Sequence, residues 1–254
     1  MNCFSLAGKT AIITGGISGI GKAVSLAMAE AGANPVLVDI REPADNSLIE
    51  RIGSLGREAM FVQADVSKEQ DVERFVAQTV TRFGRIDIAV NCAGTVNRTP
   101  VENLTEAEWD RVMNINLKGV FWCCQKVGRQ MIAQQSGSIV NIASMSGLIV
   151  NKDRTITPYC VSKAGVSMLT KNLAMEWVKH NIRVNAIGPG YVLTPLNPWM
   201  TNDPAKAGAA FEMTPMKRFG QPEEIASVAV FLASPGASFI TGQTIFADGG
   251  YTCW

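Results

Sequence analysis

The segment Thr10-Ala11-Ile12-Ile13-Thr14-Gly15-Gly16-Ile17-Ser18-Gly19-Ile20-Gly21 decides the fold of this chain. Its first five residues form a short apolar run that is typical of a buried strand, and a helical pattern follows over residues 22–30. A glycine turn between a strand and a helix lets backbone N–H groups and the helix dipole approach a pyrophosphate. The segment therefore predicts a strand, a phosphate-binding turn and a helix, in that order.

The spacing of the glycines allows two interpretations of this turn. Gly15, Gly19 and Gly21 follow G-x-x-x-G-x-G, which differs from the commoner G-x-G-x-x-G of dinucleotide sites. Residues 16–22 also fit the G-x-x-x-x-G-K of a nucleoside-triphosphate loop. That loop needs a Ser or Thr hydroxyl for magnesium at the next position, where this chain has Ala23. A dinucleotide site is therefore favoured.

Short runs rich in Val, Ile and Ala alternate with longer helical patterns along the 254 residues. The runs are Thr10–Thr14, Asn34–Ile40, Ala59–Ala64, Ile86–Asn91, Gly137–Ile142, Ile182–Ile187 and Thr244–Ala247. Buried strands separated by helices predict a parallel, doubly wound α/β sheet. We therefore expect a Rossmann-type fold with about seven parallel strands, in which residues 1–254 form a single domain.

Local signals mark the start of several helices. Thr105 with Glu108 has the spacing of a capping box, and so has Ser67 with Gln70. Pro158 suits the first turn of a helix, where its missing N–H is not needed. We expect helices to begin at these three places.

Residues 194–220 interrupt the alternation with four prolines and several large apolar side chains. A long insertion of this composition is more often a lid over a site than a plain linker. We expect a substrate lid here. A mobile surface loop with incidental hydrophobic residues is the alternative.

The composition argues against several classes of function. The formal net charge is +1, from 23 basic and 22 acidic residues, which offers no basic stripe for nucleic acid and no polybasic anchor for a membrane. No apolar run reaches the roughly 18 residues of a membrane span. The six cysteines lack a C-x-x-C spacing, and the only histidine, His180, follows Lys179 at an expected helix end, so we expect no metal site. Reduced thiols suit the cytoplasm, which is therefore the expected location. The expected substrate is a small molecule.

Acidic residues close two of the expected strands beside the glycine turn. A carboxylate at the position of Asp39 can accept hydrogen bonds from an adenosine ribose and repels a 2′-phosphate, so it favours NAD over NADP. Arg41 is a competing signal, because its guanidinium could accommodate that phosphate. Asp65 and Val66 end the next strand, where they could border the adenine. The alternative is that Asp65 only caps the turn before Ser67.

A tyrosine and a lysine four residues apart are candidates for chemistry. Tyr159 and Lys163 lie at the start of a helical pattern over residues 158–178, so both side chains project from one face. Ser144 follows the strand that ends at Ile142, at the edge where open parallel sheets place ligands. An ammonium about 4 Å from a tyrosine hydroxyl is worth up to roughly 4 kcal/mol at an effective dielectric near 20, or about three pKa units. Lys163 alone could therefore bring the pKa of Tyr159 into the range of a base near neutral pH.

Five motifs occur along the chain in a characteristic order. They are the glycine turn, Asn91-Cys92-Ala93-Gly94, Asn116 with Ser144, Tyr159-Cys160-Val161-Ser162-Lys163 and Pro189-Gly190. In these motifs the chain resembles the short-chain dehydrogenase/reductase family over essentially all of its length. The resemblance implies an oxidoreductase that moves a hydride between NAD(H) and a carbonyl/alcohol pair.

The resemblance also implies roles for individual residues. Tyr159 would be the acid/base, and Lys163 would bind the ribose and depress the tyrosine pKa. Ser144 would polarise the substrate oxygen, and Asn116 would hold a proton-relay water. Pro189 and the residues after it would meet the nicotinamide end. The implied cofactor contacts are Gly15, Ser18, Gly19, Ile20, Gly21, Asp39, Asp65, Val66, Asn91, Ala93, Gly94, Tyr159, Lys163, Pro189, Gly190, Val192 and Thr194.

Two departures from the family pattern bear on the site. Cys92 stands where the family usually has the second Asn of Asn-Asn-Ala-Gly, so a side-chain amide contact is lost and the local sheet bonding is in question. The loop from Ser144 to Tyr159 runs two residues longer than is usual in the family, so we expect a reshaped pocket wall.

Two stretches narrow the resemblance within the family. Residues 144–151 and 248–254 look like those of members that act on polyols and ketoses, such as arabinitol, galactitol or sorbose enzymes. We therefore expect a polyol or ketose substrate. An NADPH-dependent ketone or β-ketoacyl reductase is the alternative. A non-catalytic nucleotide-binding relative would normally lack part of the tetrad, which is complete here as Asn116, Ser144, Tyr159 and Lys163.

The helical pattern from Trp109 to Ile132 is apolar on nearly all sides, so it has to bury two faces. One face would lie on the sheet, and a second subunit is the simplest cover for the other. We expect a homotetramer, or at least a dimer, joined through Val120, Phe121 and Met131 and through the neighbouring helix at residues 159–178.

Overall fold

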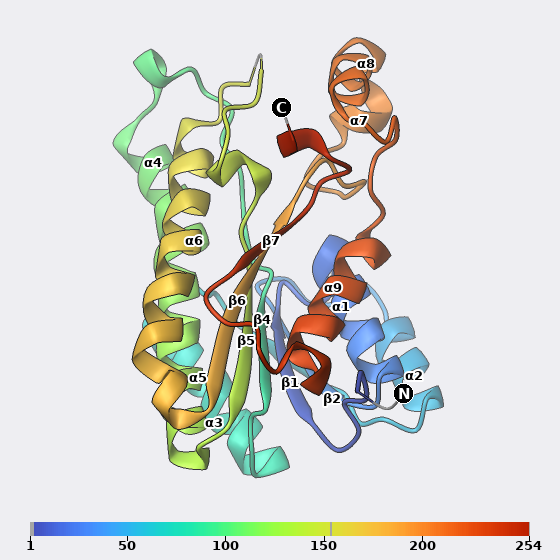
Figure 1. The fold of residues 1–254 in the computed structure, drawn as a ribbon, viewed down its shortest axis with the longest axis vertical. Coiled ribbons are helices and arrows are strands. Elements are labelled where there is room, and N and C mark those ends of the chain that lie inside the picture. Colours follow the sequence, from blue (N-terminus) through green and yellow to red (C-terminus); the bar gives the residue numbers. More distant parts are fainter. Residues whose placement is uncertain (1–2, 153, 254) are drawn as a thin grey trace.

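A parallel sheet of seven strands forms the centre of the computed structural model, which describes residues 3–152 and 154–253 (Figure 1). The strands are β1 (Thr10–Thr14), β2 (Asn34–Asp39), β3 (Met60–Gln63), β4 (Ile88–Asn91), β5 (Gly137–Ile142), β6 (Ile182–Pro189) and β7 (Thr244–Ala247). Their order across the sheet is β3-β2-β1-β4-β5-β6-β7. The expected Rossmann-type fold is confirmed, and each predicted strand is present with ends that differ by at most two residues.

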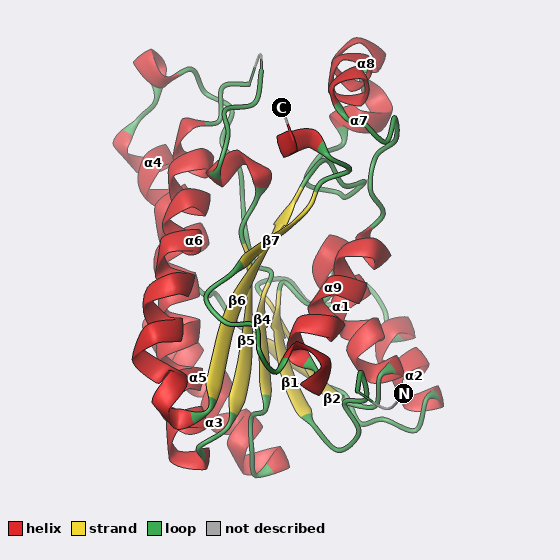
Figure 2. Ribbon diagram, in the orientation of Figure 1, coloured by secondary structure: helices red, strands yellow, loops and turns green. Residues whose placement is uncertain are grey.

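Helices cover both faces of the sheet (Figures 1 and 2). Alternate strand residues point to opposite faces, so Ile12 packs with α3, α5 and α6, whereas Ile13 packs with α1 and α9. Both layers are buried, which explains why the strands read as continuous apolar runs. The helices are α1 (Gly19–Glu30), α2 (Ser47–Ser54), α3 (Glu69–Phe83), α4 (Glu106–Met113), α5 (Gly119–Gln134), α6 (Thr157–Trp177), α7 (Trp199–Asn202), α8 (Pro204–Met213) and α9 (Pro222–Ala233).

The strand order determines where a ligand can lie. From β1 the chain moves outward to β2 and β3, then crosses back to β4 on the other side of β1. The carboxyl ends of β1 and β4 therefore flank the point at which the winding reverses, which is where open α/β sheets bind their ligands. Residues 194–220, called the lid segment here after their expected role, follow β6 at this same edge, with α7 and α8 at the upper right of Figure 1.

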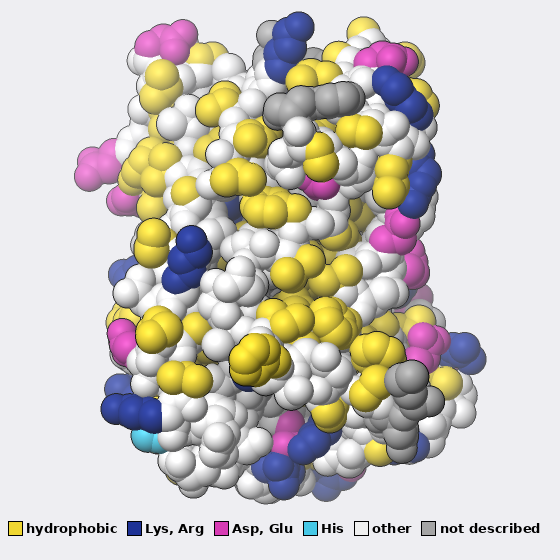
Figure 3. Space-filling model, in the orientation of Figure 1, with side chains coloured by type: hydrophobic (Ala, Val, Ile, Leu, Met, Phe, Trp, Pro, Cys, Tyr) yellow, Lys and Arg dark blue, Asp and Glu magenta, His cyan; other side chains and the backbone are white. Residues whose placement is uncertain are grey.

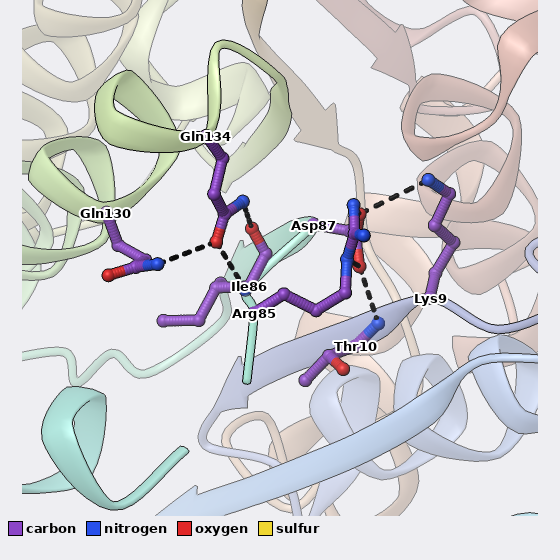
Figure 4. Close-up of polar contacts among 7 residues, drawn as sticks. All are labelled: Lys9, Thr10, Arg85, Ile86, Asp87, Gln130 and Gln134. Atoms are coloured by element: carbon purple, nitrogen blue, oxygen red, sulfur yellow. Dashed lines mark hydrogen bonds and ion pairs between the residues drawn. The ribbon is translucent and has the colours of Figure 1, made fainter. Parts of the chain in front are cut away.

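A polar network holds the amino ends of the strands, on the side of the sheet away from the ligand edge (Figure 4). Asp87, just before β4, accepts hydrogen bonds from Arg85 Nε at 2.8 Å and from the backbone N–H of Thr10 at 3.0 Å. Gln134 of α5 bonds to both backbone groups of Ile86, at 3.0 and 2.8 Å. These contacts fix the start of β4 against β1 and α5.

The long helix expected from Trp109 to Ile132 is divided. It consists of α4, a π-helical turn at Asn114–Lys118, and α5. A π-turn inserts one extra residue into the helix and rotates the side chains that follow it. Asn116 lies within this turn and is fully buried.

Two of the three predicted helix starts are confirmed, and one is wrong. The capping box of Thr105 and Glu108 is confirmed at α4, and Pro158 lies in the first turn of α6. The box predicted for Ser67 and Gln70 is wrong, because α3 begins at Glu69 with Lys68 as its N-cap. The Ser67 hydroxyl instead donates to Asp65 at 2.7 Å. Short 3-10 turns occur at Val101–Asn103, Met145–Gly147, Val178–His180, Pro235–Ala237 and Tyr251–Cys253.

Candidate active site

The glycine turn between β1 and α1 has a backbone that other residues could not adopt. Gly15 and Gly19 have φ angles of +66° and +49°, in the left-handed region. A Cβ on Gly16 would lie 2.7 Å from the Ile13 carbonyl oxygen. Ser18 is the N-cap of α1, but its side chain does not bond to the helix, so the first N–H groups of α1 lack a side-chain cap. The turn therefore offers close backbone approach and helix N–H groups to an anion.

A carboxylate and a guanidinium lie together beside this turn. Asp39 ends β2 and is buried, and its Oδ1 accepts hydrogen bonds from Arg41 N at 3.1 Å and Nε at 3.4 Å. Arg41 Nη2 also donates to Ser18 Oγ at 2.9 Å. Asp39, which favours NAD, and Arg41, which favours NADP, are therefore in direct contact at the end of β2.

Three residues that the sequence predicts to contact the cofactor are instead bonded or packed within the protein. They are Asp65, Val66 and Asn91. Asp65 accepts from the N–H and the hydroxyl of Ser67, at 2.9 and 2.7 Å, which is the turn-capping alternative. Val66 is buried in the core between the sheet and α3, α5 and α6. Asn91 is buried at the end of β4 and donates to Asn141 Oδ1 at 2.8 Å.

The segment after β4 passes directly over the glycine turn. Cys92 N donates to the Thr14 carbonyl at 3.2 Å, and Ala93 N donates to Thr14 Oγ1 at 3.2 Å. The sheet bonding thus continues past Cys92 despite the missing amide. Burial raises the pKa of the Cys92 thiol to about 12, so the thiol is neutral. Gly94 is exposed, and a Cβ there would lie 3.5 Å from Asn116 Oδ1 and 3.8 Å from Lys163 Nζ.

Lys163 and Asn116 are both fixed by hydrogen bonds. Lys163 is buried on α6 and donates from Nζ to the carbonyl of Ile142, at the end of β5, at 2.6 Å. Burial lowers the pKa of Lys163 to about 8. Asn116 accepts from Thr95 N at 2.8 Å and donates to Thr95 O at 2.9 Å and Ser162 Oγ at 3.2 Å. The amide therefore connects the π-helical turn to the loop after β4 and to α6.

Tyr159 lies in the first turn of α6 and shares a pocket with Ser144, which follows β5. Burial raises the pKa of Tyr159, while the Ser144 hydrogen bond and the charge of Arg98 act in the opposite direction. The expected lowering by Lys163 is absent in the protein alone. Lys163 Nζ lies 5.7 Å from the centre of the tyrosine ring and donates to the Ile142 carbonyl.

The last group of predicted residues joins β6 to the lid. Gly190 N donates to the Ala247 carbonyl at 3.0 Å, and a Cβ on Gly190 would lie 2.6 Å from Asp248 Cα. Val192 is buried and pairs with Gly220 in an isolated bridge that joins the two ends of the lid segment. A Cβ on Gly19 would lie 3.5 Å from the Thr194 side chain, so residues 194–220 begin directly beside the glycine turn.

Ser144 and Tyr159 open into one pocket beneath the lid segment. The sequence did not single out four of its large side chains, Arg98, Arg154, Tyr191 and Trp199. They come from loops and from α7, and no periodic pattern marks them. The lining residues are Val96, Arg98, Ser144, Met145, Ser146, Asn151, Arg154, Ile156, Tyr159, Gly190, Tyr191, Leu196, Asn197 and Trp199.

Two other kinds of site are absent from the described residues, 3–152 and 154–253. No group of three or more His, Cys, Asp or Glu side chains there could hold a metal ion. In the same part of the chain, no helix has the length and apolar character to cross a membrane.

Comparison with known proteins places this geometry in context. Residues 15–252 match the family described as enoyl-(acyl carrier protein) reductase. The chain is 40% identical to a galactitol 2-dehydrogenase of Rhizobium johnstonii, over 99% of this chain and 98% of the relative. It is 41% identical to an NAD-dependent glycerol dehydrogenase of Listeria innocua, over 98% and 96%. A crystal structure of a gluconate 5-dehydrogenase from Burkholderia cenocepacia, in complex with NADP and tartrate, aligns with a TM-score of 0.94 at 38% identity, over 100% of this chain and 98% of that one.

Proposed function

The chain belongs to the short-chain dehydrogenase/reductase family and is an NAD(P)-dependent oxidoreductase, and from this premise we propose that it interconverts a secondary alcohol and a ketone of a polyol or ketose. The observation that carries the proposal is the pocket in which Ser144 and Tyr159 lie side by side next to the carboxyl ends of the strands. Relatives named for galactitol and glycerol support a polyhydroxylated substrate.

The residues of the glycine turn fit a dinucleotide. The left-handed glycines and the uncapped first turn of α1 form a cradle that side chains would fill. We propose NAD as the cofactor, because the buried carboxylate of Asp39 would accept the ribose hydroxyls and repel a 2′-phosphate. Asp65, Val66 and Asn91 would shape the adenine side of the site through the loops that they hold. The remaining proposed cofactor contacts are Gly15, Ser18, Gly19, Ile20, Gly21, Ala93, Gly94, Pro189, Gly190, Val192 and Thr194.

A nicotinamide cofactor held at this site would supply the hydride for ketone reduction and would accept it in alcohol oxidation. Tyr159 would give its hydroxyl proton to the ketone oxygen, and would take the proton back in the reverse reaction. Ser144, within hydrogen-bond reach of Tyr159, would hold the same oxygen.

Lys163 and Asn116 would support this proton transfer. Lys163 already has one hydrogen bond, to the Ile142 carbonyl, and its remaining N–H groups can serve the ribose. The oxidised nicotinamide is a cation, so its charge would act to lower the pKa of Tyr159, against the burial that raises it. Asn116 would order a proton-relay water near Gly94, the exposed residue next to its amide.

A second candidate function is an NADPH-dependent ketone or acyl-thioester reductase. The observation that favours it is the position of Arg41. Its guanidinium lies against Ser18 in the glycine turn and could donate hydrogen bonds to a 2′-phosphate. The matching family is also described as a reductase of acyl carrier protein substrates.

The experiment that separates the two functions is a panel of polyols, ketoses and acyl thioesters, each followed by nicotinamide absorbance with NAD(H) and with NADP(H). We expect polyol oxidation with NAD to be the fastest reaction. Turnover confined to acyl thioesters and NADPH would overturn the proposal.

We propose a homotetramer in the cytoplasm, with two kinds of subunit contact. On α6, Val161, Met168 and Met175 are exposed and repeat every seven residues, so they form one apolar row. At the β7 edge of the sheet, Phe239 is fully exposed, and hydrophobic side chains gather in the middle of the face that presents β7 and α9 (Figure 3). Exposed apolar surfaces of this kind are typical of interfaces. All six cysteines are free, as suits a reducing compartment.

One part of the expected interface is wrong. Val120 and Met131 are buried inside the subunit, in the core between the sheet and α3, α5 and α6, so neither can meet a second chain. Phe121 is half-buried and packs against Trp122, with 5.0 Å between ring centres. The expectation failed because α5 packs against the sheet, α3 and α6 of its own subunit, so these apolar residues are already covered.

A further inference from the structure

Two positively charged side chains line the pocket that contains Ser144 and Tyr159. Arg98 comes from the loop after β4, and Arg154 from the lengthened loop before α6. None of the residues that line this pocket is Asp or Glu. Within the described part of the chain, neither guanidinium forms an ion pair with a carboxylate. Among the described residues, the pocket therefore carries two positive charges that no carboxylate pairs with.

Each guanidinium is oriented by the lid segment. Arg98 Nη2 donates to the carbonyl of Leu196 at 3.2 Å and to Asn197 Oδ1 at 3.4 Å. Arg154 stacks on Trp199 of α7, with its Cζ 3.7 Å from the ring centre. Neutral carbonyl and ring contacts hold these cations in place but leave their charge unbalanced.

The two cations influence each other. Partial burial and the like charge of Arg154 both lower the pKa of Arg98. An anion between them would remove this repulsion and would use donors that remain free, since a guanidinium has five N–H groups in a planar fork. A carboxylate matches that fork with two parallel hydrogen bonds.

We propose that the substrate carries a carboxylate, which Arg98 and Arg154 bind while Ser144 and Tyr159 hold the reacting oxygen. This inference rests on the proposed function and narrows its substrate from neutral polyols and ketoses to sugar acids. The carboxylate fixes the position of the chain of hydroxyl groups in the pocket and takes no part in the bond changes. Closure of the lid segment would bring both guanidiniums to the anion together, because both contact that segment.

The test compares matched pairs of substrates that differ only in the terminal group. A panel of five- and six-carbon alditols and the aldonates of the same configuration, including D-glucitol with D-gluconate and galactitol with D-galactonate, is assayed with NAD and with NADP. For the preferred configuration we expect kcat/KM for the aldonate to exceed that for the alditol by at least about tenfold. Arg98→Gln and Arg154→Gln should each lower kcat/KM for the aldonate at least about tenfold more than for the alditol, mainly through KM.

Arg51→Gln is the matched control, because Arg51 is exposed on α2, away from the residues that line the pocket. It should leave the ratio of aldonate to alditol activity unchanged. Arg154→Lys keeps the charge and should restore part of the aldonate activity that Arg154→Gln loses.

A binding measurement decides the matter if an arginine variant fails to fold. Tyr159→Phe leaves the pocket charges in place, so calorimetric titration of this variant with cofactor and D-gluconate or D-glucitol measures affinity without turnover. Tighter binding of D-gluconate, weakened by added salt, supports the proposal. Equal binding of the two, or oxidation of alditols with no aldonate preference, overturns the inference and leaves the proposed function standing. Absence of any turnover across the panel counts against the proposed function itself.

Discussion

The Gly21 Cα lies so close to the carbonyl of Gly15 that a Cβ built on Gly21 would be 2.0 Å from the carbonyl oxygen and 2.7 Å from its carbon. Real Cβ atoms do not approach a backbone atom this closely, and a backbone carbonyl cannot move aside without opening the turn. The first turn of α1 and the end of β1 are therefore in direct backbone contact, and this contact sets the shape of the proposed phosphate cradle.

We expect Gly21→Ala to destabilise the chain by about 1–3 kcal/mol, because the overpacked turn has to shift. Binding of NADH should weaken at least about tenfold, because the N–H groups of the turn lose their alignment. Thermal unfolding and fluorescence titration with NADH measure the two effects. Gly53→Ala on α2 is the control, since a Cβ there meets open space and should leave stability equal or slightly higher. Wild-type affinity in Gly21→Ala would show that the turn does not bind the cofactor.

Tyr159→Phe should remove nearly all turnover and leave the affinity for cofactor little changed. The substitution deletes the hydroxyl that shares the pocket with Ser144 and keeps the ring. Loss of a general acid/base typically costs about 100- to 10,000-fold in rate. Steady-state kinetics and NADH titration check this expectation. Retention of about a tenth or more of wild-type turnover would contradict the assignment.

Asp39→Ala should narrow the preference for NAD over NADP, because it removes the carboxylate that repels a 2′-phosphate. It also releases Arg41, which Asp39 holds through two hydrogen bonds. The measurement is kcat/KM for both cofactors. Arg41→Ala is the paired variant, and it should widen the preference for NAD. A wild-type protein that already prefers NADP would mean that Arg41, and not Asp39, determines the cofactor preference.

Asp87→Asn should destabilise the chain by about 1–3 kcal/mol near neutral pH, because the buried carboxylate binds Arg85, Lys9 and the Thr10 N–H. Burial acts to raise the pKa of Asp87, but the Arg85 and Thr10 hydrogen bonds and Lys9 outweigh it, and the pKa is lowered. A lowered pKa in the folded state gives stability that is present above the unfolded value and is lost as pH falls through the folded value.

The difference in unfolding free energy between Asp87→Asn and the wild type should therefore shrink between about pH 5 and the lowered pKa. Urea unfolding across this range measures it. Asp110→Asn, at an exposed position on α4, is the control and should show little change at any pH. A cost that stays constant with pH would mean that the Asp87 carboxylate charge contributes nothing.

Met168→Glu and Phe239→Glu should each reduce a tetramer to dimers, because they place a charge in different proposed interfaces. Met168→Glu should also lower activity, since α6 carries Tyr159 and Lys163, whereas Phe239→Glu should not. Light scattering and activity at micromolar concentration distinguish the cases. A wild-type monomer with full activity would contradict both interfaces.

Local sequence patterns were sufficient for the sheet and for the glycine turn. Buried parallel strands produce continuous apolar runs, and the backbone of the turn is accessible only to glycine, so both leave a mark on the sequence. The π-helical turn at Asn116 leaves none, because it depends on packing against the loop after β4 and on α6. The failed capping box at Ser67 has a similar cause, since Asp65 competes for its hydroxyl.

The electrostatics of the site depended even more on the tertiary structure. Sequence spacing placed Tyr159 and Lys163 on one helix face, but it could not show that the lysine is directed to the Ile142 carbonyl. Arg98 and Arg154 are 56 residues apart and meet only where two loops approach the same pocket. Long-range contacts of this kind have no periodic signal in the sequence.

The Asp87 network lies at the amino ends of the strands, and the residues that line the pocket lie at the carboxyl ends. The contacts that keep the strands in register are therefore separate from those that select a substrate. Mutations in the loops around Arg98, Arg154 and Trp199 can accumulate without disturbing the strand anchors. Such a division separates the part of the chain on which substrate choice would evolve from the part that keeps the scaffold.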